Sequence, residues 1–282
     1  MLGVLLALGA ALGWGAADFL GGLKSRTVPM LAVLLVTQTT ALLLLIAVLT
    51  AFGEPLPARR YLLYAATAGL AEGIGVAALY RGLAVGTMSL VAPVASVAPA
   101  VPLVAGLLLG EVPRPLQVVG LLLAVTGVIL TSCRERTPGQ GSRKLASSTF
   151  YGLLSAAGFG VFFVALDAAS EGSIPWALFV ARSSAVLLLL VFAFSGHFRL
   201  ALARADVPLL LLIGVLIVAA DAMYATATTL GLLGIVAVVG ALHTVVTIGL
   251  ARVFLRERIA RWQELGIVAC IVGVLIITGA SA

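Results

Sequence analysis

The chain has 282 residues, of which 62% are hydrophobic and only 10% are charged. A mean hydropathy of +1.22 is more apolar than a water-soluble globule can accommodate, so the composition indicates a membrane protein. The formal net charge of +6 could suggest a nucleic-acid partner, but the Lys and Arg residues stand in short clusters between apolar runs. That pattern is typical of the flanks of membrane spans, so we expect lipid contacts and no nucleic acid.

Proline, glycine and charged residues divide the apolar sequence into ten runs. A helix needs about 20 apolar residues to cross roughly 30 Å of hydrocarbon. Only helices are expected, because no segment shows the alternation of a barrel strand. The predicted spans cover residues 2–22, 29–52, 61–80, 86–109, 115–132, 148–168, 174–195, 207–228, 231–254 and 262–280.

The first span contains Gly13 and Gly15, and the sixth repeats this spacing at Gly158 and Gly160. Small residues allow helices to approach closely, so these glycines are predicted to serve packing. Asp18 lies in the same first span, where a carboxylate costs several kcal/mol unless it faces a partner or water. Asp18 is therefore a candidate functional residue.

The third and eighth spans also carry polar side chains. Glu72 and Tyr80 are eight residues apart, which places them about 80° apart around a helix, so both could line one cavity. In the eighth span, Asp221, Tyr224 and Thr228 follow the spacing i, i+3 and i+7. This spacing predicts that the three side chains share one helical face.

The fourth span contains Pro93, Pro99 and Pro102, each of which removes a backbone donor. A kinked or partly opened helix is therefore expected, with either a structural or a functional role. The ninth span has no proline, but His243 and Thr244 lie at about the depth of Pro99. The sequence leaves open whether His243 is structural or functional.

The seventh span contains one base, Arg182. Its two open interpretations are pairing with an acid of another span and contact with a carboxylate of a substrate. Asp18, Glu72 and Asp221 cannot all be neutralised by one base, so at least one carboxyl should be protonated, exposed to water or reserved for a cation. We predict Glu72 as that unpaired acid, because it lies deepest in its span and shares a broad face with Tyr80. The alternative is that Glu72 only bonds to a neighbouring helix.

Two stretches of the chain, 107–130 and 253–276, repeat one pattern at a constant offset of 146 residues, close to half the chain length. Such an offset indicates duplication. We expect a first five-helix half at 1–132, a polar linker at 133–147 and a second five-helix half at 148–282. Five crossings in each half would invert one half relative to the other. The residues Leu109, Glu111, Gln117, Gly120, Gly127 and Val128 recur as Leu255, Glu257, Gln263, Gly266, Gly273 and Val274.

With Trp14, the segments ALYRG and AMYAT, and the twin blocks GE/RE…Q…G…G, the chain resembles the EamA family of the drug/metabolite transporter superfamily. The resemblance covers nearly the whole chain. It implies ten helices as two inverted five-helix repeats that move small metabolites or drugs across the bacterial inner membrane, often outward. Tyr80 and Tyr224 match the family's aromatic residue near the end of the third helix of each repeat. Glu111 and Glu257 match its Glu at the close of the fourth.

The second half departs from the family pattern at His243 and Thr244, where the resemblance implies an aromatic residue followed by proline. A hinge there would work differently from one in the first half.

Nothing in the sequence indicates catalysis. Glu111 and Glu257 are paired acids, but each stands at a span end beside Arg, where the dipole of the following helix favours an acid for structural reasons. The motifs GxSxG, HExxH and GxxxxGK[ST] are missing from the sequence, so no catalytic residue, cofactor or metal is expected. Cys133 and Cys270 have no metal-type spacing and are predicted to be apolar filler.

The sequence and the resemblance together favour a secondary transporter of the bacterial cytoplasmic membrane that exports a small organic metabolite by alternating access, with proton coupling left open. A multidrug exporter of the same fold is the alternative, suggested by Trp14, Phe19, Phe159, Phe162 and Phe163. A membrane enzyme or a non-transporting scaffold is the third hypothesis. The expected partners are a small-molecule substrate and lipid, with the chain a monomer or homodimer. The candidate substrate-binding or coupling residues are Trp14, Asp18, Glu72, Tyr80, Arg182, Asp221, Tyr224 and His243.

Orientation follows from the distribution of Lys and Arg, most of which fall in the loops after odd-numbered spans. By the positive-inside rule these loops face the cytoplasm, so both termini should face outward, although EamA members are often drawn with cytoplasmic termini. We therefore expect a C-terminal green fluorescent protein fusion to stay dark in bacteria and an alkaline phosphatase fusion to be active. Bright fluorescence would refute the predicted orientation.

Overall fold

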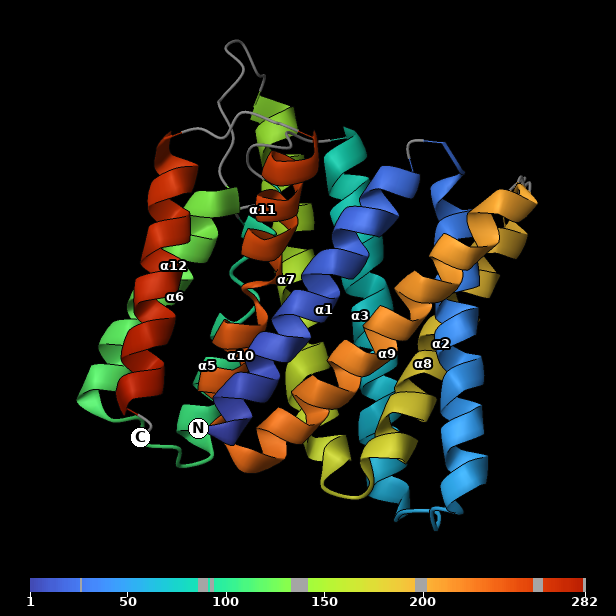
Figure 1. Ribbon diagram of the computed structural model, residues 1–282, viewed down its shortest axis with the longest axis horizontal. Coiled ribbons are helices and arrows are strands. Elements are labelled where there is room, and N and C mark those ends of the chain that lie inside the picture. Colours follow the sequence, from blue (N-terminus) through green and yellow to red (C-terminus); the bar gives the residue numbers. More distant parts are fainter. Residues whose placement is uncertain are drawn as a thin grey trace.

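The computed structural model describes residues 1–25, 27–85, 91, 94–132, 142–195, 202–255 and 261–280, and within these ranges the regular elements are helices without any strand. Figure 1 shows them side by side in one bundle with both termini at the same end. The elements are α1 (Leu2–Lys24), α2 (Met30–Phe52), α3 (Arg59–Val85), α5 (Ala100–Leu108), α6 (Pro115–Ser132), α7 (Ser142–Ser170), α8 (Ile174–Ser195), the 3-10 turn η1 (Arg204–Asp206), α9 (Val207–Leu230), α10 (Leu233–Gly240), α11 (His243–Leu255) and α12 (Arg261–Ala280).

Within the described residues, seven stretches are long and apolar enough to cross a membrane, and Pro115–Leu130 is a shorter apolar helix. Large apolar side chains such as Leu12, Leu43 and Leu275 are more than half exposed, as expected where lipid replaces water. The described residues are therefore all-α, as predicted, and seven of the ten predicted spans are long and apolar enough to cross a membrane. The bounds of α8 match the predicted seventh span, whereas α7 begins at Ser142, inside the range assigned to the linker.

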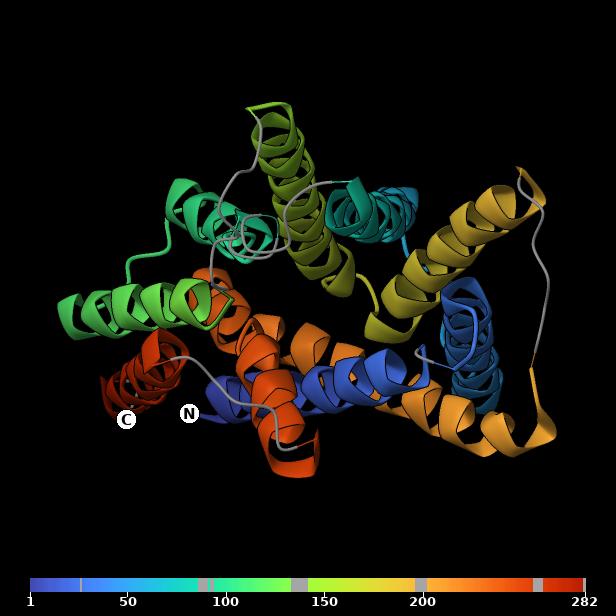
Figure 2. The same ribbon diagram turned by 90° about the horizontal axis from the view of Figure 1, so that it is seen from above.

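Helices from the two halves of the chain pack against each other throughout the bundle. From the first half, α1 lies along α9 of the second half, α3 lies along α7 and α8, and α6 lies along α12. Figure 2 shows the same interleaving from above, with α6 and α12 at one edge and α2 and α8 at the other. The two halves therefore share one core.

The duplicated glycines form the contact between α6 and α12. A Cβ atom added to Gly120 would lie 2.7 Å from the carbonyl oxygen of Gly273, and one added to Gly127 would lie 2.6 Å from that of Gly266. Each glycine thus meets the counterpart of the other, so the two helices run antiparallel. Cys270 is buried in the same contact, as predicted for an apolar filler, whereas Cys133 lies outside the described residues.

The glycines of α1 and α7 also serve close packing, as predicted. A Cβ atom on Gly13 would lie 2.9 Å from the Cβ of Ala220 in α9, and one on Gly160 would overlap Val101. Gly158 crosses the backbone of Gly75 in α3. These close approaches bring α1 against α9 and α7 against α3, which positions the polar side chains described below.

The fourth predicted span is interrupted at its prolines, as expected. Residues 96–99 form turns, and α5 begins at Ala100 with Pro99 as its N-cap. Pro93 lies outside the described residues.

The ninth predicted span, 231–254, agrees with the apolar stretch Leu233–Phe254, which is long enough to cross a membrane, but it is not one uninterrupted helix. It divides into α10 and α11 at Ala241 and Leu242, although no proline is present. At this break the hydroxyl of Thr247 donates to the carbonyl oxygens of His243 at 2.9 Å and of Gly15 at 3.1 Å. The close approach of α1 at Gly15 thus lies beside the interruption between α10 and α11. In the first half, the corresponding interruption occurs at proline residues.

Candidate functional site

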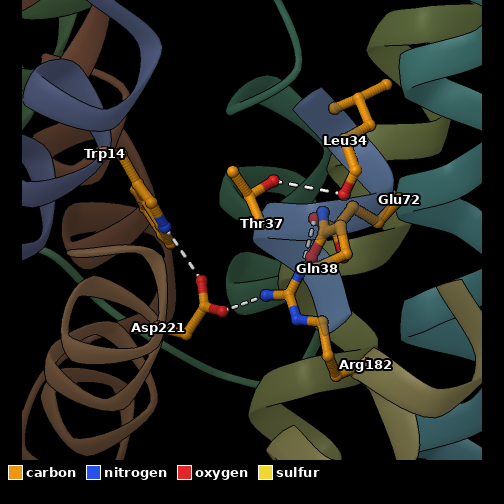
Figure 3. A network of polar contacts seen from close by, with 7 residues as sticks. All are labelled: Trp14, Leu34, Thr37, Gln38, Glu72, Arg182 and Asp221. Atoms are coloured by element: carbon orange, nitrogen blue, oxygen red, sulfur yellow. Dashed lines mark hydrogen bonds and ion pairs between the residues drawn. The ribbon is translucent and has the colours of Figure 1, made fainter. Parts of the chain in front are cut away.

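Arg182 of α8 lies at the meeting point of four helices. Its side chain is buried, and its guanidinium group donates to the Gln38 side chain of α2 and pairs with Asp221 of α9. A third partner is Glu72 of α3, whose Oε1 lies 3.3 Å from Nη1 of Arg182. Figure 3 shows the guanidinium between Asp221 on one side and Gln38 with Glu72 on the other. Of the two interpretations of Arg182, the structure shows pairing with acids.

Trp14 of α1 extends this network into the first helix. Its indole N–H donates to Oδ1 of Asp221 at 2.8 Å, while Arg182 contacts Oδ2 of the same carboxylate. Both oxygens of Asp221 therefore have a donor. The network joins three helices of the first half, α1, α2 and α3, to two of the second, α8 and α9.

Glu72 is less well satisfied than Asp221. Its Oε2 atom is buried and has no hydrogen-bond partner among the described residues. The prediction that Glu72 is the unpaired acid is nevertheless wrong, because Glu72 and Asp221 share Arg182, and the contact matches the alternative of a bond to a neighbouring helix. Glu72 and Arg182 lie together because of the way α3 and α8 are oriented about their own axes. The hydropathy of the sequence does not predict that orientation.

An aromatic cluster lies beside the network. The ring centroids of Trp14 and Tyr224 are 5.4 Å apart, and Phe163 of α7 lies 5.0 Å from Tyr224 and 6.1 Å from Trp14. Tyr224 is fully buried, and Asp221 and Thr228 of the same helix are also buried. The predicted common face of these three α9 residues is therefore confirmed.

Asp18 and His243 form a second polar pair. Oδ2 of Asp18 lies 2.9 Å from Nδ1 of His243, at the start of α11. The Asp18 side chain is 54% exposed and has a partner. The ring of His243 meets the edge of Trp14 at 6.2 Å, which links this pair to the network. The side chain of Tyr80 lies outside the described part of the structure.

A cavity of about 300 Å³ lies between α2, α3 and α8. It extends from the first turn of α2 to the depth of Gln38 and Glu72, the polar residues among those that line it. The other lining residues are apolar or glycine, namely Met30, Leu31, Leu34, Gly73, Val76, Ala77, Ala185, Leu188 and Leu189.

Sequence reasoning missed two residues here. Gln38 belongs to the run Thr-Gln-Thr-Thr at 37–40, the polar interruption of an apolar span, and this run was the available signal. Asp167 is a half-buried carboxylate of α7 that lies beside Thr228 of α9. The rule that identified Asp18, the cost of a carboxylate in a span, applied equally to Asp167.

Glu111 has the structural role that was expected, with a different helix as its partner. Its carboxylate accepts hydrogen bonds from the backbone N–H groups of Leu233 at 2.6 Å and Gly234 at 3.3 Å. It therefore caps the N-terminus of α10 in the other half of the chain and not α6, which follows it. Glu257 lies outside the described residues.

Across the described ranges, no group of three His, Cys, Asp or Glu side chains could hold a metal ion. The chemistry that the site offers is therefore ion pairing, hydrogen bonding and aromatic contact around an apolar cavity.

A comparison with curated proteins finds no match. Among the solved structures 27 chains match. One is a crystal structure described simply as that of a protein, with a TM-score of 0.79 and 16% sequence identity, and the match covers 98% of this chain and 96% of that one. At this identity the likeness shows the fold alone.

The model of the EamA-like transporter family matches residues 1–133 and again residues 146–279. The match thus occurs twice and takes in nearly the whole sequence, as the resemblance implied. This chain belongs to the EamA-like transporter family, part of the drug/metabolite transporter superfamily.

Proposed function

We propose that the chain is a secondary transporter with ten membrane spans in two inverted five-helix repeats, and that it exports a small organic metabolite across the bacterial inner membrane. The observation that carries this proposal is the buried network of Arg182, which links helices of both halves next to a cavity. Ionisable groups at this depth are costly and typically mark a substrate or ion pathway. The antiparallel contact of α6 with α12 supports the inverted arrangement.

Alternating access would move helices of one repeat against the other around this network. Trp14 and Asp221 join α1 to α9, and Arg182 and Glu72 join α8 to α3, so a relative movement of these helices must break or rearrange contacts at the site. The role of Trp14, Asp18, Tyr224 and His243 in this proposal is to line or close the path beside the charged centre. Proton coupling would use the carboxylate in excess over Arg182.

A multidrug exporter is the second candidate, favoured by the apolar walls of the cavity and the aromatic cluster of Trp14, Phe163 and Tyr224. The two candidates differ in selectivity. A metabolite exporter should discriminate among compounds of similar hydrophobicity, whereas a multidrug exporter should accept unrelated apolar compounds.

The function can be tested by comparing the metabolites released by cells that overproduce the protein with those released by cells lacking it. At least one small metabolite should accumulate outside the overproducing cells, and purified protein in liposomes should move it down its gradient. Asp221→Asn, produced at an equal level in the membrane, should reduce that flux. Absence of any flux would indicate a scaffold, and chemical turnover without a membrane barrier would indicate an enzyme.

The break before α5 offers a test of the moving element. Pro99→Ala supplies a backbone N–H at the N-cap of α5 and lets the helix extend toward residues 96–98, which should stiffen the interruption. We expect normal membrane insertion with a changed transport rate. Pro102→Ala, within α5, serves as the comparison. Unchanged transport by Pro99→Ala at normal protein levels would make the bend purely structural.

A further inference from the structure

The buried network around Arg182 carries one more acid than base. Asp221 receives hydrogen bonds on both carboxylate oxygens, from Trp14 and from Arg182. Glu72 has a 3.3 Å contact from Arg182 to one oxygen, and its other oxygen has no partner within the described residues. The uncompensated negative charge is therefore concentrated at Glu72.

Glu72 is also the acid that faces the cavity. It lines the cavity together with Gln38, whereas Arg182 and Asp221 do not. Its side chain is 17% exposed, against 5% for Asp221 and 4% for Arg182. A molecule that enters the cavity thus meets the side chain of Glu72 before it meets the guanidinium group.

The remaining walls are suited to an apolar molecule. Leu31 and Leu34 of α2 line the cavity together with Leu188 and Leu189 of α8, and Ala77 of α3 also lines it. A volume of about 300 Å³ is at the lower end of the range of about 300–1,000 Å³ for small-molecule sites. The cavity therefore combines an apolar body with one anionic end.

We propose that this cavity binds a small organic amine in its protonated form, with the ammonium group at the carboxyl group of Glu72 and the apolar body against the leucines of α2 and α8. This names the substrate class of the transporter proposed above and rests on that function. An ammonium ion balances the excess carboxylate and supplies the missing hydrogen-bond donor. A carboxylate ligand would add a second uncompensated charge, because Arg182 is already shared by two acids.

The test uses three probes with the same ring and different heads, benzylamine, benzyl alcohol and benzoate, added to purified protein in detergent near neutral pH. Benzylamine should raise the midpoint of thermal unfolding in a concentration-dependent manner, while the neutral and anionic probes should leave it nearly unchanged. Glu72→Gln should weaken benzylamine binding at least about tenfold. The matched control is Glu264→Gln, an acid-to-amide change at a side chain that is 49% exposed, and it should bind as the wild type does.

Ala77→Phe fills the cavity without altering any charge, so it should also abolish the stabilisation by benzylamine. This variant provides the test if Glu72→Gln fails to fold. Preferential binding of benzoate, or equal benzylamine binding by wild type, Glu72→Gln and Ala77→Phe, would overturn the proposal. Export of a metabolite by a protein that binds no amine would refute the substrate class and leave the transport function standing. Amine binding without any flux in liposomes would support the site and refute transport.

Discussion

Arg182→Gln should reduce the free energy of unfolding by about 3–5 kcal/mol, or prevent folded protein from accumulating, because it leaves two acids without their shared cation. Arg182 is only 3% exposed, and Glu72 and Asp221 both lie against it. An uncompensated carboxylate at this depth costs several kcal/mol, and Gln can satisfy at most part of the lost hydrogen bonding. The measurement is the temperature at which purified protein loses its monodisperse peak in size-exclusion chromatography.

The matched control is Arg252→Gln in α11. Arg252 pairs with Glu264 at 2.7 Å, but both side chains are about half exposed, so this pair should contribute less than about 1 kcal/mol. Equal stability of Arg182→Gln and Arg252→Gln would show that the buried network does not hold the helices together.

A neutral network separates the structural role of Arg182 from its functional role. Combining Arg182→Gln with Glu72→Gln and Asp221→Asn removes all three charges while keeping similar shapes and hydrogen-bonding groups. We expect this triple variant to regain much of the stability lost by Arg182→Gln, since it leaves no unpaired charge. It should remain inactive in transport, and restored transport would show that charge at the site is dispensable.

The sequence identified the charged residues of this network but did not predict which of them pair with one another. Arg182, Glu72 and Asp221 were identifiable because a charge inside an apolar span is expensive wherever it occurs. Their pairing depends on how each helix is rotated and how deep it lies, which the packing of neighbouring helices sets. For that reason Glu72 was wrongly predicted to be unpaired, and Gln38, a neutral residue with a smaller cost of burial, was overlooked.

The helix positions were also predicted only in part. The apolar runs predicted α2 and α8 to within one residue, because span length is fixed by the thickness of the hydrocarbon. The turn between α10 and α11 could not be predicted, since no proline marks it. In the structure it coincides with the approach of α1 at Gly15, a contact between segments more than 200 residues apart in the sequence.

The duplicated pattern, in contrast, also marks a contact between the two copies. The recurrence of Gly120 and Gly127 as Gly266 and Gly273 indicated duplication, and in the structure these glycines also form the interface between the two copies. A symmetric contact between inverted copies requires each glycine to meet the counterpart of the other. Recurring small residues in such a chain are therefore candidates for self-complementary contacts.

Gly158→Ala should be among the most damaging substitutions outside the charged network, with an expected loss of at least about 1–3 kcal/mol. A Cβ atom at Gly158 would lie 2.7 Å from Cα of Gly75 and 2.8 Å from the carbonyl oxygen of Ala71. Both are backbone atoms of α3, so no side chain can rotate away, and α3 and α7 must separate. The same chromatographic measurement of thermal stability reports this loss.

Gly249→Ala is the matched control, because Gly249 also lies within a helix and a Cβ atom there would meet nothing within 4 Å. It should be neutral or stabilising by up to about 1 kcal/mol, since alanine restricts the unfolded chain more than glycine does. Equal behaviour of the two variants would show that α3 and α7 do not need their close approach.

If Gly158→Ala can be purified, its amine binding should also weaken. Gly75 lies one helical turn beyond Glu72, so a displacement of α3 would move the Glu72 carboxylate away from Arg182.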